Sequence, residues 1–135
     1  MSRHNYRGMM NTVLVEDKFD HELFFSALAD RTRLRLLNLM RGREVCVCFF
    51  AETLGTNNPK ISRHLAYLKR ASLVIGRREG KWMHYRIKPP KHKRAAKVFA
   101  ATLDMLKDDP QMQADRERLT GVCAPAMISI GRQKA

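Results

Sequence analysis

The chain has 135 residues, and its 26 lysines and arginines outnumber its 13 aspartates and glutamates, for a formal net charge of +13. This length suits one domain with a single core. The charge favours a polyanionic partner, nucleic acid before an anionic membrane surface. No apolar run approaches the roughly 20 residues that cross a bilayer, and the N-terminus lacks a signal peptide's apolar core. We therefore expect a cytoplasmic protein with no membrane partner.

Hydrophobic periodicity divides the chain into three parts. Residues 1–18 show no steady period and are predicted to form a flexible N-terminal arm. Residues 19–107 carry the alternating patterns of a folded domain. Residues 108–135 are predicted to be a tail that is mostly loop, with at most a short helix at 115–118, and the tail carries Cys123.

Three short helices are predicted in the first half of the domain. Apolar residues at spacings of three and four predict a helix over residues 19–30. Asp30, together with Thr32, supplies N-cap chemistry for a second helix, residues 32–40. Apolar residues on most sides of this helix predict its burial. A third helix is predicted from residue 45 or 47 to residue 54, with both Cys46 and Cys48 at its front.

A fourth helix follows a glycine-containing turn and is rich in cations. Ile61, Leu65 and Leu68 define its buried side. Helix, tight turn and basic second helix is the arrangement of a helix-turn-helix that inserts its second helix into a DNA groove. The residues of this helix that we expect to contact DNA are Asn57, which also caps the helix, Asn58, Lys60, Ser62, Arg63, His64, Tyr67 and Arg70.

Strand patterns come next. Residues 73–75 and 82–87 flank a charged stretch in which Glu79–Gly80 is a plausible hairpin turn. A charged tip on a hairpin that follows a basic helix is typical of a DNA-touching wing, and Trp82 and Tyr85 are expected to anchor this wing to the core. The predicted DNA contacts of the wing are Arg77, Arg78 and Lys81.

A long apolar helix over residues 95–106 closes the domain. A small domain does not need so apolar a terminal helix unless a partner covers it, which predicts a symmetric homodimer with two reading helices on two half-sites. The expected fold class is therefore mainly α with a small β-hairpin: a winged helix-turn-helix of about five helices plus a two-stranded wing. Residues 19–107 would form the DNA-binding and dimerisation domain.

The order and spacing of these pieces resemble the ArsR/SmtB family of metal-responsive winged-helix repressors. The resemblance implies a homodimer that blocks transcription on double-stranded operator DNA and leaves when it binds a metal or metalloid. The stretches that carry the resemblance are residues 27–37, 44–48, 61–65 and 77–82.

The pair Cys46 and Cys48 looks like the arsenic-resistance branch of that family, which implies arsenic(III) or antimony(III) as inducer, bound by thiolates. Two departures are visible: Phe49 stands where the branch commonly has an aspartate, and Phe50 stands near where some members have a third cysteine. The ligands of the zinc-sensing branch on the last helix look absent. Cys123 or water could complete the site.

Residues two apart do not share a face of a regular helix. Cys46 and Cys48 could therefore chelate one ion only if the helix begins after Cys46 or unwinds. In the alternative, both are small buried hydrophobes. Other open interpretations are a sensor of cadmium, lead or zinc, a redox- or persulfide-sensing repressor of the same fold, and a ligand-free DNA or RNA binder. In the redox case Cys123 would have to be a partner, because the spacing of two makes a bond between Cys46 and Cys48 strained. An enzyme is disfavoured, because no catalytic constellation is evident, and no organic cofactor is expected.

Overall fold

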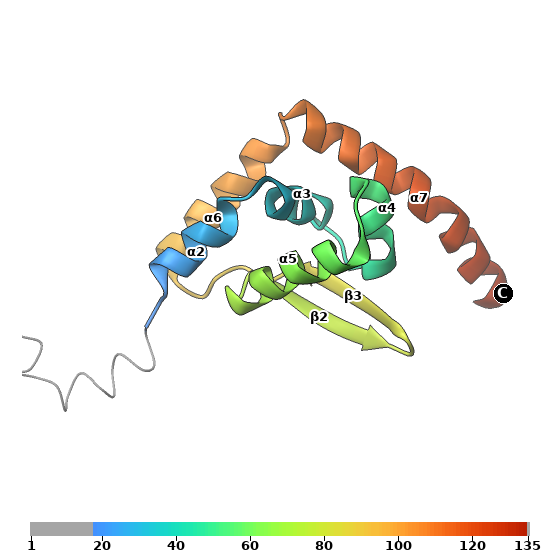
Figure 1. Cartoon of the computed structure of the whole chain (residues 1–135), viewed down its shortest axis with the longest axis horizontal. Helices are drawn as coiled ribbons and strands as arrows, with labels where there is room; N and C mark the ends of the chain where they lie inside the picture. The colour runs from blue at the N-terminus through green and yellow to red at the C-terminus, as the bar shows by residue number, and fades with distance from the viewer. Residues whose placement is uncertain (1–17, 135) are drawn as a thin grey trace, which may run out of the picture.

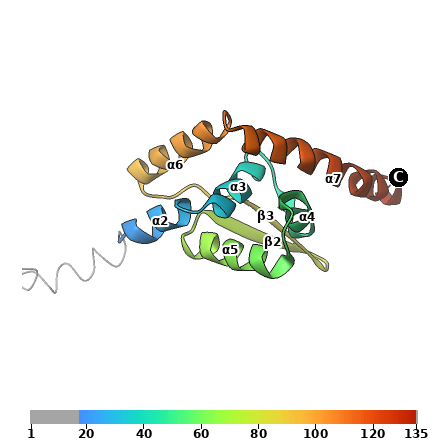
Figure 2. The same cartoon turned by 45° about the horizontal axis from the view of Figure 1, so that its top comes forward.

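The computed structural model describes residues 18–134, with side chains to residue 123, so the predicted arm lies almost wholly outside the described residues. The helices form one body, and a small antiparallel sheet lies along one side of it (Figures 1 and 2). The elements in chain order are α2 His21–Leu28, α3 Arg31–Leu39, β1 Val45–Cys46, the 3-10 helix η2 Val47–Phe49, α4 Phe50–Leu54, α5 Asn58–Arg70, β2 Val74–Glu79, β3 Trp82–Ile87, α6 Lys93–Leu106 and α7 Pro110–Lys134.

The first two described helices begin at aspartates, as N-cap chemistry predicts. The Asp20 carboxylate accepts from the Leu23 N–H at 2.9 Å, and the Asp30 carboxylate accepts from the Arg33 N–H at 3.0 Å. The predicted burial of α3 is confirmed, because Leu36, Leu37, Asn38 and Leu39 are all buried. This helix lies at the centre of the molecule and packs against α2, α5, α6 and α7.

The recognition helix expected from the sequence is α5. Gly55 adopts a left-handed conformation, φ 68°, and closes α4. The Asn57 side chain then accepts from the Lys60 N–H at 3.0 Å and starts α5. Ile61, Leu65 and Leu68 are buried, so the predicted inner face of this helix is confirmed.

The sheet has three strands in the order β1-β3-β2, not the two that the sequence predicts. Val45 pairs with Tyr85, and Cys46 pairs with His84. The prediction that a helix begins at residue 45 is therefore wrong, because the backbone there is extended and adds a short edge strand to β3. The regular helix α4 begins only at Phe50.

The wing is a two-residue hairpin in which Glu79 pairs with Trp82. The turn is therefore Gly80–Lys81, one residue later than predicted, and Gly80 supplies the positive φ of 61° that this turn needs. Arg77 and Arg78 lie within β2, not in the turn. The hairpin projects from the helical body (Figure 1).

The C-terminal segment is the long helix α7, which corrects the prediction of a loop. Met112 and Leu119, seven residues apart, are fully buried against the rest of the protein. Between them the buried Asp115 carboxylate accepts from Arg35 Nε at 2.7 Å, and Asn38 Nδ2 donates to the Met112 carbonyl at 2.9 Å. These contacts hold α7 along α3 and α4, as both views show (Figures 1 and 2).

Candidate functional site

The exposed side of α5 presents cations. Lys60, Ser62, Arg63 and Arg70 are exposed on the helix, opposite its buried leucines. Asn57 and Asn58 are also exposed at its N-terminal end, where backbone N–H groups and the helix dipole favour a phosphate. The predicted residues thus share one accessible surface.

His64 and Tyr67 are only half-exposed, because both contact Arg33 of α3. The Arg33 guanidinium lies 4.0 Å from the centre of the Tyr67 ring, and its Nη1 is 3.3 Å from His64 Nδ1. The same guanidinium donates to the carbonyls of Ser26 at 2.8 Å and Ala27 at 3.0 Å, at the end of α2. Sequence reasoning missed this role, since a single arginine in a helix gives no sign of so distant a set of partners.

The wing arginines differ in their surroundings. Arg77 forms an ion pair with Glu44, its Nε lying 3.1 Å from Oε2, and a second contact with Glu79 at 3.4 Å. The hydrogen bond from Arg77 holds the pKa of the Glu44 carboxyl below its usual value. Arg78 and Lys81 are exposed in the described structure.

The aromatic residues of the wing also behave differently from one another. Tyr85 packs against the core, as expected, and its ring lies over Gly76. The expectation that Trp82 anchors the wing is wrong, because 48% of its surface is exposed at the hairpin end. Its ring faces the Lys81 ammonium at 5.2 Å, which gives the wing end an aromatic as well as a cationic character.

The two nearby thiols meet where β1 ends. Cys46 is buried in the strand, Cys48 lies in η2, and their sulfurs are 3.0 Å apart, with Cys48 donating. Because the regular helix starts after both residues, the spacing of two places the thiols together. Burial, and then the hydrogen bond with Cys46, raise the pKa of Cys48 to about 12 although the residue as a whole is exposed.

Cys123 is half-buried on α7 and packs against the core. Burial raises the pKa of its thiol, and the charge of Arg43 opposes that rise. The helix α7 that carries Cys123 contacts η2, which carries Cys48. Among the residues that the structure describes, no three histidine, cysteine, aspartate or glutamate side chains converge as a metal site. The fold therefore brings Cys46 and Cys48 together but does not assemble a three-thiol cluster.

An apolar surface runs over α2 and α6. Phe25, Val98 and Met105 are exposed by 52%, 40% and 67%, respectively. A hollow of about 270 Å³ between the two helices is lined almost wholly by apolar and aromatic groups, including Phe24 and Ala95. In the described part of the chain, no helix is long and apolar enough to cross a membrane.

Residues 30–75 match the family described as bacterial regulatory protein, arsR family. The arsenical resistance operon repressor of Escherichia coli K12 is 45% identical over 76 residues, which are 56% of this chain and 65% of that protein. The arsenic resistance transcriptional regulator ArsR1 of Pseudomonas putida KT2440 is 46% identical over 68 residues, 50% of this chain and 53% of that protein. The chain thus spans less than two thirds of either regulator.

An uncharacterized HTH-type transcriptional regulator of Methanocaldococcus jannaschii is 42% identical over 64 residues, 47% of this chain and 72% of that protein. Among solved structures, the homodimeric winged helix-turn-helix DNA-binding domain of a possible ArsR-family regulator from Mycobacterium bovis has a TM-score of 0.54 and 27% identity, over 79% of this chain and 89% of that chain. These relatives are transcriptional regulators and not enzymes. With its winged helix-turn-helix fold, the chain belongs to the ArsR family of bacterial regulatory proteins.

Proposed function

We propose that this protein is a transcriptional repressor that leaves its operator when trivalent arsenic or antimony binds the thiols of Cys46 and Cys48. The observation that carries the proposal is the 3.0 Å distance between the two sulfurs, at the point where β1 gives way to η2. Soft sulfur donors select thiophilic ions. The similarity to arsenic-resistance regulators of two bacteria supports the same choice.

The α5 helix and the wing would form the DNA-binding surface. Lys60, Arg63 and Arg70 on the helix and Arg78 and Lys81 on the wing are all exposed, and they contribute to a chain whose net charge is +13. Such cations supply the phosphate contacts that position a reading helix in a groove. The predicted contacts of Asn57, Asn58, Ser62, His64, Tyr67 and Arg77 belong to the same proposal.

Two copies would associate through α2 and α6. Exposed large apolar side chains are unfavourable in water unless a partner covers them, and Phe25, Val98 and Met105 form such a set. A two-fold contact between these helices would present two α5 helices to two half-sites. The homodimeric state of the similar Mycobacterium bovis domain supports this arrangement.

Neutral thiols suit arsenous acid better than a divalent cation. When arsenous acid condenses with two thiols, two arsenic–sulfur bonds replace two arsenic–oxygen bonds, and the thiol protons leave within two water molecules. A divalent cation must instead displace both protons. The raised pKa of Cys48, caused mainly by burial, opposes that displacement.

An ion bound at this pair would act on both DNA-contacting elements. Cys46 pairs with His84 of β3, so a shift of β1 reaches the wing directly. Cys48 lies just before α4, which packs on α5, so the same shift reaches the recognition helix. Cys123 is the proposed third ligand; its recruitment would move α7 toward the pair, and water would fill the position otherwise.

The test follows release of the protein from labelled DNA taken from upstream of its own gene, by fluorescence anisotropy. Arsenite and antimonite should release the wild type, while Cys46→Ser and Cys48→Ser should bind DNA normally and stay bound. Retained release in Cys123→Ser would indicate two thiols plus water, and lost release would indicate three thiols. Failure of arsenite and antimonite to release the wild type would refute the proposal, and release by cadmium, lead or zinc instead would indicate a sensor of divalent metals.

The same sulfur distance supports a second candidate, a peroxide-sensing repressor. Two thiols and hydrogen peroxide give one disulfide and two water molecules, so Cys46 and Cys48 could form a reversible bond. Release by peroxide that a dithiol reverses, together with no response to arsenite, would favour this candidate over the metalloid sensor.

A further inference from the structure

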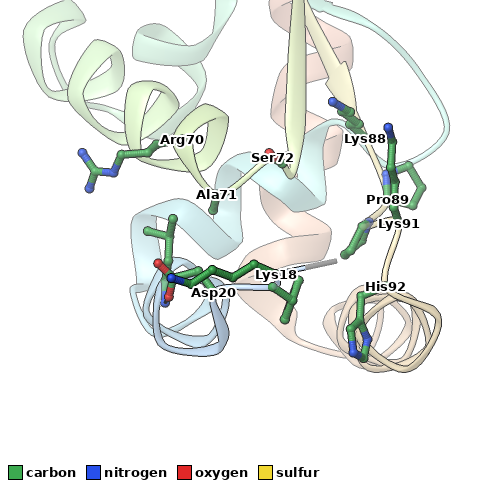
Figure 3. A pocket seen from close by; sticks show the side chains of 12 residues that line it. Lys18, Asp20, Arg70, Ala71, Ser72, Lys88, Pro89, Lys91 and His92 are labelled. Carbon is green, nitrogen blue, oxygen red and sulfur yellow. Dashed lines mark hydrogen bonds between the residues drawn. The ribbon is translucent and has the colours of Figure 1, made fainter. Parts of the chain in front are cut away.

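A hollow of about 560 Å³ lies at the C-terminal end of α5, away from the thiol pair. Figure 3 shows side chains from three places around it: the end of α5, the segment that enters α2, and the segment that joins β3 to α6. Ser72 closes α5 with a left-handed backbone, φ 61°, and turns the chain into β2 at the edge of this hollow. Three elements that are distant in sequence therefore contribute to one concave surface.

Cations dominate the polar lining. Lys18, Arg70, Lys88 and Lys91 contribute to it, and among the side chains that the structure describes none of them pairs with a carboxylate. The lining carboxylate, Asp20, already accepts the Leu23 N–H at 2.9 Å as the cap of α2.

His92 also lines the hollow, and it carries no negative charge that could offset these cations. Its Nδ1 accepts the Ala95 N–H at 3.1 Å as the cap of α6. The four cations outnumber the one carboxylate of the lining, so the hollow carries a net positive charge that attracts an anion.

We propose that this hollow binds phosphate groups of the DNA backbone and extends the DNA-binding surface beyond α5 and the wing. The proposal rests on the proposed function, since it requires that α5 faces DNA. Arg70 connects the two regions, because it is exposed on α5 and also lines the hollow. A chain of phosphates that passes Arg70 would meet Lys88 and Lys91 next.

The position of the hollow specifies which phosphates these are. It adjoins the start of α2 and the cap of α6, the two helices of the proposed dimer contact. In such a dimer the two hollows would lie between the two reading helices, next to the duplex that separates the half-sites. Phe19, Pro89 and Pro90 give the hollow apolar walls, against which a deoxyribose can pack.

The experiment measures how the affinity for a labelled duplex of random sequence depends on salt. Each phosphate contact contributes about 0.9 to the slope of log K against log salt concentration. In the double variant Lys88→Gln, Lys91→Gln the magnitude of this slope should therefore be smaller by about 2 per protomer. The pair Lys88→Arg, Lys91→Arg should keep the wild-type slope, because it keeps both charges.

Two controls separate this proposal from the others. Arg118→Gln removes one exposed cation on α7, away from the hollow, and should leave the slope unchanged. Arg63→Gln on α5 should reduce the magnitude of the slope if α5 contacts DNA as proposed. A normal slope in the double lysine variant beside a lowered slope in Arg63→Gln would overturn the hollow's role alone, whereas normal slopes in both would overturn the proposed DNA surface as well.

The remaining alternative is that the hollow binds a free phosphate ion and not the DNA backbone. Inorganic phosphate would be titrated into the DNA-free protein at constant ionic strength, and amide chemical shifts would be followed by NMR. Saturable shifts around Ser72 that vanish in the double lysine variant, together with a normal DNA slope, would assign the hollow to a free phosphate and refute the backbone contact. Weak or absent shifts with a reduced DNA slope are the expected result.

Discussion

The recognition helix and the C-terminal helix are built by different kinds of information. α5 is specified locally: Asn57 caps it, and Ile61, Leu65 and Leu68 repeat at helical spacing. α7 is held in place by contacts with residues far away in the chain, such as that between Asp115 and Arg35. A helix of the first kind is visible in the sequence, and one of the second kind is visible only once its partners are in place.

The largest expected effect tests whether α7 is part of the core. Leu119→Ala removes a side chain with no exposed surface, which should lower the free energy of unfolding by about 3 kcal/mol. Thr120→Ala, at the exposed neighbouring position, is the matched control. Urea denaturation measures both, and a loss of under about 1 kcal/mol for Leu119→Ala would mean that α7 behaves as the loop its sequence suggests.

The next effect tests the ion pair that positions α7. Asp115→Asn leaves the Arg35 guanidinium half-buried without its counter-charge, and we expect a loss of about 2 kcal/mol in the free energy of unfolding. Asp104→Asn, which breaks an exposed pair with Lys107, should change stability by less than about 0.5 kcal/mol. Equal effects of the two substitutions in thermal or urea unfolding would contradict the structural role of Asp115.

A smaller effect probes the locally specified helix. Asn57→Ala deletes the cap of α5 and should cost about 1 kcal/mol of stability. Asn58→Ala changes an exposed residue of the same type one position later and should be nearly neutral. If the two variants unfold at the same urea concentration, the start of α5 is held by tertiary packing and not by its cap.

The smallest effect concerns pH. The hydrogen bond from Arg31 holds the pKa of Asp109 below its ordinary value of 3.8. A carboxyl with a depressed pKa in the folded state stabilises that state above its ordinary pKa, and the stabilisation disappears as pH falls through the folded pKa. Unfolding measured from pH 5 downward should therefore show a slightly shallower loss of stability in Asp109→Asn than in the wild type; identical curves would contradict this.

How much the sequence could predict depends on the range of the interactions involved. The caps Asp30 and Asn57 act over three residues, so the starts of α3 and α5 could be predicted from the local pattern. Asp20 caps α2 over the same range, but it was not predicted. Strand β1 was missed because two residues show no period of their own and are strands only through their pairing with β3. Trp82 was misplaced because an aromatic residue in a strand usually faces a core, and here the hairpin carries it past the core's edge.

The candidate thiol site also combines features that are visible in the sequence with features that depend on long-range packing. The sequence placed Cys46 and Cys48 two residues apart and left their geometry open. Only the end of β1 and the 3-10 turn after it explain why their sulfurs are in contact. The partners of Cys123 could not be predicted at all, since they depend on where α7 packs.

The contacts of Arg33 have a consequence for how the protein would approach DNA. Because one guanidinium joins the carbonyl end of α2 to His64 and Tyr67 of α5, the helix at the proposed dimer contact and the reading helix have a fixed relative orientation. The conformational entropy of ordering α5 relative to α2, which together form the reading head, is then lost mostly during folding and not on binding to DNA. A preorganised head of this kind should associate with DNA quickly.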